Sequence, residues 1–197
     1  CYPYNACSTA LGQTTFDEAF LERYQIDYNR IEIAEGNYKG QRLTKELFFK
    51  LREKEPSLST IGHVMKGEEV DMAMIHPGIC VASDGFLHHL EGHPRVSGTF
   101  PRFIKKYVKD KKVINLFQAI EKMTYLPATR LGIKKGSLGI NDDADIVIFD
   151  INEIEDLATF KKPALGPNGI KYVLVNGQIA VQEKQIVRNQ LGKAVRR

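Results

Sequence analysis

An aspartate that follows a short apolar segment has the clearest capacity for chemistry in this sequence. Ile79–Ala82 is apolar on both faces and rich in residues that favour strands, which predicts a buried parallel strand. Ser83-Asp84-Gly85 comes directly after it. A carboxylate at the carboxyl end of a buried strand lies where α/β barrels place catalytic groups, and it can move protons as a general acid or base. The same tripeptide also forms ordinary turns and helix caps.

The segment after Asp84 contains further side chains that could bind a ligand. Arg95, in a stretch that we expect to be a loop, has a guanidinium that can hold a carboxylate through two parallel hydrogen bonds. An ordinary surface salt bridge is the alternative for this arginine. His88, His89 and His93 are metal-ligand types, but a metal site would need additional histidines at strand ends. The alternatives are a polar surface loop and, for His93, a role in bracing the loop that carries Arg95.

Three helical segments are expected around these residues. Apolar residues recur at helical spacing from Gln41 to Glu53, and a second short helix is predicted from Glu68 to Ile75. A third helix is predicted after Asn115, a potential N-cap, with Pro127 as its breaker and Gly132 as the stop of the helical region. The apolar face of this third helix consists of Ile114, Phe117, Ile120 and Met123. We expect this face to pack into the core.

The character of the sequence changes from about Gly136. Ala144–Asp150 predicts a strand, and Tyr172–Val175 and Gln178–Val181 flank Asn176-Gly177, the strongest short signal for a β-hairpin. These segments predict a small β-rich subdomain after an α/β part. Three strands would leave an open edge and half a core, so we expect this subdomain to pair with further strands from elsewhere.

The overall composition is that of a soluble globular protein. The 197 residues are 43% hydrophobic and 26% charged, and the net charge of +4 arises from Lys and Arg scattered among 24 acidic residues. A nucleic-acid partner would instead favour a basic stripe interleaved with aromatic residues, so none is expected. No apolar run approaches the ~18 residues of a membrane span and no signal-peptide pattern is present, which makes a cytoplasmic location the default.

A series of short motifs extends along nearly the whole chain. In order, they are Tyr2-Pro3-Tyr4, Ser8-Thr9, Leu11, Ser83-Asp84-Gly85, His93-Pro94-Arg95, Gly98-Thr99-Phe100-Pro101-Arg102, Met123-Thr124, Pro127-Ala128, Leu131-Gly132, Asp143-Ala144-Asp145, Phe149-Asp150 and Val175-Asn176-Gly177. In order and spacing, these motifs resemble the N-acyl-D-amino-acid deacylase (D-aminoacylase) family of the metal-dependent amidohydrolase superfamily. The motifs from His93 to Phe100 and the tyrosine-rich opening point to the deacylase branch, whereas Thr14–Ile61 matches only loosely.

The resemblance implies an α/β fold in two parts. Residues 1–135 would form the C-terminal part of a (β/α)8 amidohydrolase barrel, and residues 136–197 the C-terminal strands of a small β-sandwich subdomain that draws strands from both chain ends. The family's first barrel strands, its His-x-His pair, its metal-bridging cysteine and its later histidine ligands have no counterpart here. Because the sequence opens at Cys1 without an initiator methionine, we expect a fragment whose missing N-terminal half carries these features.

The resemblance also implies roles for four residues. Asp84 matches the general acid/base carboxylate and could contribute to a metal site, whereas Arg95, Tyr2 and Ser8 match residues that hold the α-carboxylate of the substrate. The implied reaction is zinc-dependent cleavage of an N-acyl-D-amino acid into a carboxylate and a D-amino acid. We expect the isolated chain to be inactive and to hold no zinc alone, since zinc needs three or four protein ligands. Its open sheet edges could support homo-oligomers.

Two alternatives to a D-aminoacylase activity remain. The motifs from Gly136 to Gly177 would also fit dihydroorotases and hydantoinases, so the substrate could be a cyclic amide or a peptide-like amide. The chain could also be a non-catalytic binding or scaffold module. An upstream coding sequence with a His-x-His pair would decide against the module, and one without it would favour the module.

Overall fold

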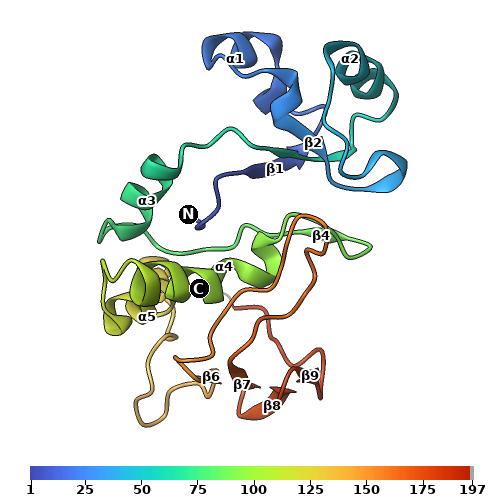
Figure 1. Cartoon of the computed structure of the whole chain (residues 1–197). Coiled ribbons are helices and arrows are strands. Elements are labelled where there is room, and N and C mark those ends of the chain that lie inside the picture. The colour runs from blue at the N-terminus through green and yellow to red at the C-terminus, as the bar shows by residue number, and fades with distance from the viewer. Residues whose placement is uncertain (196–197) are drawn as a thin grey trace.

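The computed structural model describes residues 1–195 and has a mixed α/β architecture arranged in three tiers (Figure 1). An upper tier contains β1 to β3 with α1 and α2, a central tier consists mainly of helices, and a lower tier contains the sheet β6 to β9. Arg196 and Arg197, the last residues of the predicted β-rich subdomain, lie outside the described residues. Within residues 1–195, no helix has the length and apolar character needed to cross a membrane.

The helices and strands of residues 1–195 follow one another as a mixed series. The helices are η1 (Thr14–Phe16), α1 (Glu18–Arg23), η2 (Tyr28–Arg30), η3 (Gly36–Tyr38), α2 (Lys45–Lys54), α3 (Gly67–Ile75), α4 (Arg95–Phe103), the π-helical η4 (Ile104–Asp110), α5 (Leu116–Met123) and α6 (Tyr125–Leu131). The strands are β1 (Cys7–Ala10), β2 (Ile31–Ile33), β3 (Ser59–Gly62), β4 (Leu87–His88), β5 (Glu91–Gly92), β6 (Ile146–Phe149), β7 (Ile170–Val175), β8 (Gln178–Gln182) and β9 (Gln185–Ile186).

The upper tier is an antiparallel sheet in the order β1-β3-β2 with its own hydrophobic core. Helix α2 confirms the helix predicted from Gln41 to Glu53, and it begins after Thr44 because the Thr44 hydroxyl accepts a hydrogen bond from the Leu47 backbone N–H. The core of this tier consists of Leu11, Phe16, Leu21, Ile31, Ile33, Leu43, Phe48, Leu51 and Leu58. It lies almost entirely in the segment that matches the deacylase motifs only loosely.

The central tier packs α3, α4, η4 and α5 around a second core. This core consists of Val70, Met74, Val81, Phe103, Tyr107 and Ala119. Helix α3 confirms the helix predicted from Glu68 to Ile75. Helix α5 starts at the predicted N-cap Asn115, which forms a capping box with Gln118, and the helical region ends at Gly132 in a left-handed conformation.

The predicted inward face of α5 is wrong at Phe117, which is 87% exposed. Ala119 is fully buried instead, and at about 100° per residue a side chain two positions earlier points to the opposite side of the helix. Pro127 does not end the helix either, because α5 already stops at Met123 and the proline lies within the first turn of α6.

The predicted parallel strand at Ile79–Ala82 is also wrong. The segment lies outside any helix or strand, and Val81 is buried, but the backbone N–H groups of Val81 and Ala82 donate to the carbonyls of Lys122 and Cys1 rather than to a strand. Lys122, itself buried, donates from its ammonium to the carbonyls of His76 and Ile79. The apolar composition correctly indicated burial, but a strand also needs a neighbouring strand, and α5 occupies that place here.

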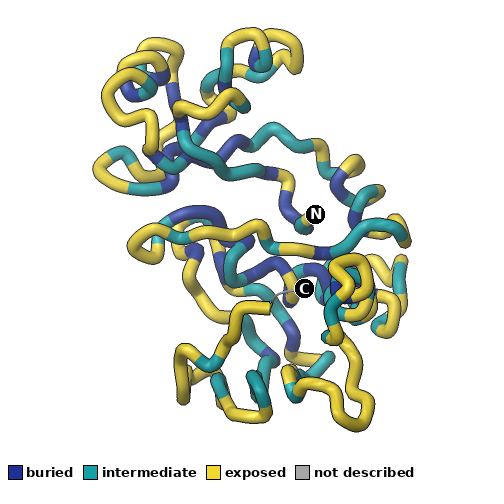
Figure 2. The backbone as a smooth tube through the Cα atoms, turned by 180° about the vertical axis from the view of Figure 1, so that it is seen from behind, coloured by how far each residue is buried: buried dark blue, intermediate teal, exposed yellow. Residues whose placement is uncertain are grey.

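The lower tier is an antiparallel sheet in the order β6-β7-β8-β9. The predicted hairpin is confirmed, since β7 and β8 flank Asn176 and Gly177, whose φ angles of 51° and 74° suit a tight hairpin turn. Strand β9 adds a fourth strand that the sequence did not predict. No residue of these strands is buried, and the lower part of the tube in Figure 2 is mostly intermediate or exposed.

A long connection between β6 and β7 links the lower tier to the upper tier. Residues 150–169 climb past α4 toward the β4 region (Figure 1). Phe160, in the middle of this connection, packs against a small apolar cluster formed by Ala6, Ala34 and Ile61. Residues of the β-rich part therefore reach the sheet of the upper tier.

Candidate functional site

Four residues singled out from the sequence meet where the upper and central tiers join. Arg95 Nη2 lies 3.1 Å from Asp84 Oδ2 and donates a 3.4 Å hydrogen bond to the Ser8 carbonyl oxygen. The Arg95 guanidinium carbon lies 4.6 Å from the centre of the Tyr2 ring, in cation–π geometry. Ser8 takes part through its backbone oxygen. The guanidinium is therefore the centre of the group, and the other three residues surround it.

Arg95 is the first residue of α4 and not part of a loop as predicted. Its burial is unusual for an arginine, with only 5% of its surface exposed, and its Nε atom is buried without a hydrogen-bond partner among residues 1–195. A buried donor without an acceptor costs about 1–3 kcal/mol. An anion with two oxygens could supply that acceptor, because guanidinium N–H groups form a planar fork that matches a carboxylate.

Asp84 lies on the irregular segment between α3 and β4, with 74% of its side chain exposed. Its φ angle of 47° is left-handed, a conformation that aspartate tolerates better than most residues. Gly85 is needed beside it, because a Cβ atom there would lie 2.5 Å from Val96 Cγ2. The backbone thus approaches α4 closely and leaves the Asp84 carboxylate facing both Arg95 and solvent.

The three histidines after Asp84 differ in their environment. His88 and His89 are exposed, and His88 lies in the β4–β5 hairpin, which agrees with a polar surface for this pair. His93 is 1% exposed, and its Nδ1 atom accepts a 3.0 Å hydrogen bond from the Arg95 backbone N–H. Burial lowers the pKa of His93 from 6.5 to about 3, with the Arg95 charge acting in the same direction. His93 is therefore neutral and braces the start of α4.

Tyr2 and Cys7 also lie in this environment. Burial raises the pKa of the Tyr2 phenol, although the Arg95 charge opposes this shift, and burial likewise raises the pKa of the Cys7 thiol. Both groups keep their protons at neutral pH. Tyr2 can thus donate a hydrogen bond to an anion held by Arg95.

Arg102 supports the N-terminal segment from below, a role that the sequence did not reveal. Its Nε atom donates a 3.0 Å hydrogen bond to the Pro3 carbonyl, its guanidinium stacks over the Tyr4 ring at 4.6 Å, and Nη1 pairs with Asp156 at 2.9 Å. Arg102 belongs to one of the motifs behind the family resemblance. Its type alone gave no indication of which carbonyl it would reach.

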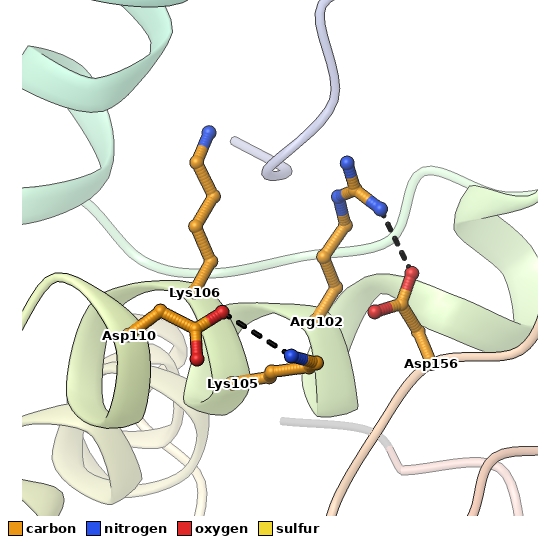
Figure 3. A pocket seen from close by; sticks show the side chains of 5 residues that line it. All are labelled: Arg102, Lys105, Lys106, Asp110 and Asp156. Carbon is orange, nitrogen blue, oxygen red and sulfur yellow. Dashed lines mark hydrogen bonds and ion pairs between the residues drawn. The ribbon is translucent and has the colours of Figure 1, made fainter.

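Arg102 also lines a hollow of about 160 Å³ in the central tier, together with Lys105, Lys106, Asp110 and Asp156 (Figure 3). Each cation that lines this hollow has a carboxylate partner, Asp156 for Arg102, Asp110 for Lys105 and Asp71 for Lys106. The hollow therefore offers little free charge to a ligand. The group around Arg95 is the stronger candidate.

The residues around Asp84 do not form a metal centre by themselves. Within residues 1–195, no three side chains of the His, Cys, Asp or Glu types come together in a way that could hold a metal ion. The ionic partner of Asp84 is the Arg95 guanidinium, which is a cation and cannot be a ligand. The described residues alone therefore do not fit a zinc ion.

Residues 69–181 match the amidohydrolase family, and the chain belongs to it. Within that family, the chain is 31% identical over 207 residues to the D-aminoacylase of Alcaligenes xylosoxydans xylosoxydans, a match that covers 100% of the chain and 41% of that enzyme. It is 39% identical over 114 residues to the N-acyl-D-glutamate deacylase of the same organism, covering 57% of the chain and 23% of that enzyme.

A solved deacylase has the same arrangement of elements. The N-acyl-D-glutamate deacylase of Bordetella bronchiseptica, with zinc and a phosphonate mimic of the tetrahedral intermediate, superposes with a TM-score of 0.78 at 30% identity. The match covers 93% of this chain and 39% of that one.

A dihydroorotase of Acetivibrio thermocellus is 37% identical, but over only 38% of the chain. The chain thus spans about two fifths of the D-aminoacylase that it matches from end to end.

Proposed function

We propose that this chain contributes the substrate-carboxylate site and the acid/base carboxylate of an N-acyl-D-amino-acid deacylase. The observation that carries the proposal is the buried Arg95, with an unpartnered Nε, in contact with Asp84, Tyr2 and the Ser8 carbonyl. These four residues come from three separate parts of the sequence. Their meeting around one guanidinium favours a substrate that has a carboxylate, and the similarity to deacylases adds the amide.

The proposed division of labour follows from the chemistry of each group. Arg95 and Tyr2 hold the α-carboxylate, the arginine by charge and the tyrosine by a hydrogen bond, and the Ser8 carbonyl orients the guanidinium. Asp84 accepts a proton from the attacking water and delivers it to the departing amine nitrogen. The products are a carboxylate and a D-amino acid.

We further propose a second part of the enzyme that works with this chain. The described residues do not fit a zinc ion, so the zinc ligands would come from that part. Residues 1–135 would complete its (β/α)8 barrel, and residues 136–197 would add strands to its β-sandwich. The exposed Val147, Ile148 and Ile179 of the lower sheet support such a contact. In the isolated chain, a second copy would cover this surface, and sedimentation would then detect a dimer.

Substitution of Arg95 tests the substrate class in the complete enzyme. The α-carboxylate stays charged throughout the reaction, so an arginine that holds it stabilises ground and transition states alike, and its loss raises KM more than it lowers kcat. Arg95→Ala should cost about 2–5 kcal/mol in kcat/KM on an N-acyl-D-amino acid. Arg95→Lys should rescue only part of this loss, since ammonium lacks the planar fork.

The matched comparison is an acyl amine that lacks the carboxylate. Its hydrolysis should hardly change in Arg95→Ala, because the arginine then has no partner to lose. Arg23→Ala, at an exposed arginine in α1, is the control for removal of a positive charge elsewhere. Equal losses on both substrates would mean that Arg95 supports the fold, and faster turnover of cyclic amides than of acyl-D-amino acids would favour the dihydroorotase-like alternative.

A further inference from the structure

The proposed carboxylate-binding groups come from two segments that are far apart in the sequence. Tyr2 and Ser8 belong to the N-terminal segment that runs into β1, whereas Arg95 begins α4. His93 connects the two segments. Its Nε2 atom lies 3.0 Å from the Ala6 carbonyl oxygen, and its Nδ1 atom lies 3.0 Å from the Arg95 backbone nitrogen. One imidazole therefore spans the distance between the two halves of the site.

These two hydrogen bonds require a single form of the imidazole. The Ala6 carbonyl can only accept, so Nε2 must carry the hydrogen, and the Arg95 N–H can only donate, so Nδ1 must be bare. This is the neutral Nε2–H tautomer. A doubly protonated ring would lose the contact with the Arg95 backbone.

Aromatic neighbours hold the imidazole in this orientation. Tyr4 meets it edge-on with ring centres 5.1 Å apart, and Phe160 packs against it at 5.1 Å with an angle of 80° between the ring planes. Phe160 belongs to the connection between β6 and β7, and it also packs against Ala6. A side chain from the β-rich part therefore fixes the residue that joins the two segments.

We propose that His93 is a positioning residue that sets the placement of Arg95 relative to the segment carrying Tyr2 and Ser8, with Phe160 holding its ring. This inference rests on the proposed function, in which Arg95 binds the substrate carboxylate. Displacement of a binding group by about 1 Å can cost up to about 10²-fold in rate. His93 acts through Arg95, so its loss should affect KM for substrates that have the carboxylate.

Two conservative variants separate the two halves of the bridge. His93→Asn keeps an acceptor near the position of Nδ1 and loses the contact with Ala6, whereas His93→Gln keeps a donor near Nε2 and loses the contact with the Arg95 N–H. In the complete enzyme, each should raise KM for the N-acyl-D-amino acid about tenfold, with kcat and the acyl amine nearly unchanged. Equal losses on both substrates, or no loss in either variant, would overturn the proposal.

His76 provides a matched control. Its Nδ1 atom accepts a 3.1 Å hydrogen bond from the Gly78 backbone N–H, the same two-residue contact that His93 makes, but at an exposed turn. His76→Asn and His76→Gln should leave both substrates unaffected. If the His76 variants also raised KM for the N-acyl-D-amino acid, the effect of the His93 variants would not be specific to His93, and the proposal would fail.

Arg95→Ala, measured alongside, separates failure of this inference from failure of the proposed function. A carboxylate-specific loss in Arg95→Ala without one in the His93 variants would reject the inference and leave the function in place. Equal losses on both substrates in Arg95→Ala would reject the carboxylate role itself. Phe160→Leu, which keeps apolar volume but removes the ring contact, should give a smaller, equally carboxylate-specific rise in KM, and a substrate-independent loss would count against the support role.

A spectroscopic measurement tests the bridge without any activity. Long-range proton–nitrogen correlation spectra of the chain should show His93 with a protonated Nε2 and a bare Nδ1 from about pH 5 to 8, a range in which an ordinary exposed histidine titrates. His93→Asn assigns the signal. A ring protonated at Nδ1, or one that titrates near the ordinary value, would overturn the proposal whatever the enzyme does.

Discussion

Gly98→Ala tests the packing beneath the site. Helix propensity alone predicts that this substitution stabilises the chain, whereas the structure predicts that it destabilises the chain. Gly98 lies inside α4, where alanine in place of glycine would normally stabilise a helix by about 1 kcal/mol. A Cβ atom at this position would, however, lie 2.1 Å from the Tyr4 hydroxyl oxygen. Tyr4 is 4% exposed, and its hydroxyl donates a 3.4 Å hydrogen bond to the Pro94 carbonyl, so it cannot move freely. The steric clash should outweigh the gain in helix propensity.

The magnitude follows from these opposing contributions. Overpacking of a core costs about 1–3 kcal/mol, and the helix gain of about 1 kcal/mol reduces this to a net destabilisation of at most about 2 kcal/mol. In a Tyr4→Phe background the hydroxyl is absent, and the next nearest atoms are Asp156 Cβ at 3.3 Å and the Tyr4 ring at 3.5 Å. Gly98→Ala should then be less destabilising than in the wild-type chain.

Urea unfolding of the four proteins of this double-mutant cycle measures the coupling. We expect a coupling energy of about 1–3 kcal/mol, which is large compared with the ~0.5 kcal/mol within which independent sites add. Gly166→Ala is the control, because a Cβ atom at Gly166 has no neighbour within 4 Å. The same free-energy change for Gly98→Ala in both backgrounds would refute the proposed clash between Gly98 and Tyr4.

Three further predictions concern His93, Lys122 and Asp84. The folded-state pKa of His93, about 3, lies below its ordinary 6.5, so only the unfolded state takes up this proton between those values. This contribution to stability should be complete above about pH 6.5 and fall by about 1.4 kcal/mol per pH unit below it, a slope absent from His93→Gln and measurable by urea unfolding at several pH values. Lys122→Met should destabilise the chain by about 1–3 kcal/mol, because the Ile79 carbonyl loses its donor and the His76 carbonyl keeps only the Ile79 N–H; unchanged thermal unfolding would contradict this. Asp84→Asn should lower kcat of the complete enzyme about 10²–10⁴-fold with little change in KM, and near-normal turnover would assign proton transfer to another residue.

The sequence by itself determined the elements whose signals are local. Helices α2 and α3 were predicted from apolar spacing within a few turns, and the β7–β8 hairpin was predicted from Asn176-Gly177, because both signals depend on neighbouring residues alone. The order of short motifs also identified the family. Asp84 and Arg95 were selected because their side chains can move a proton and hold an anion.

Only the tertiary structure decided which partners these residues meet. Ile79–Ala82 and Phe117 were predicted wrongly, because burial and strand pairing depend on whatever lies opposite, here α5 and solvent. The contacts within the candidate site likewise depend on segments that are distant in the sequence. Arg95 meets the Ser8 carbonyl 87 residues away, and His93 joins it to Ala6 across a similar separation. No local pattern encodes such contacts, since they arise when separate elements exclude water and satisfy each other's buried polar groups.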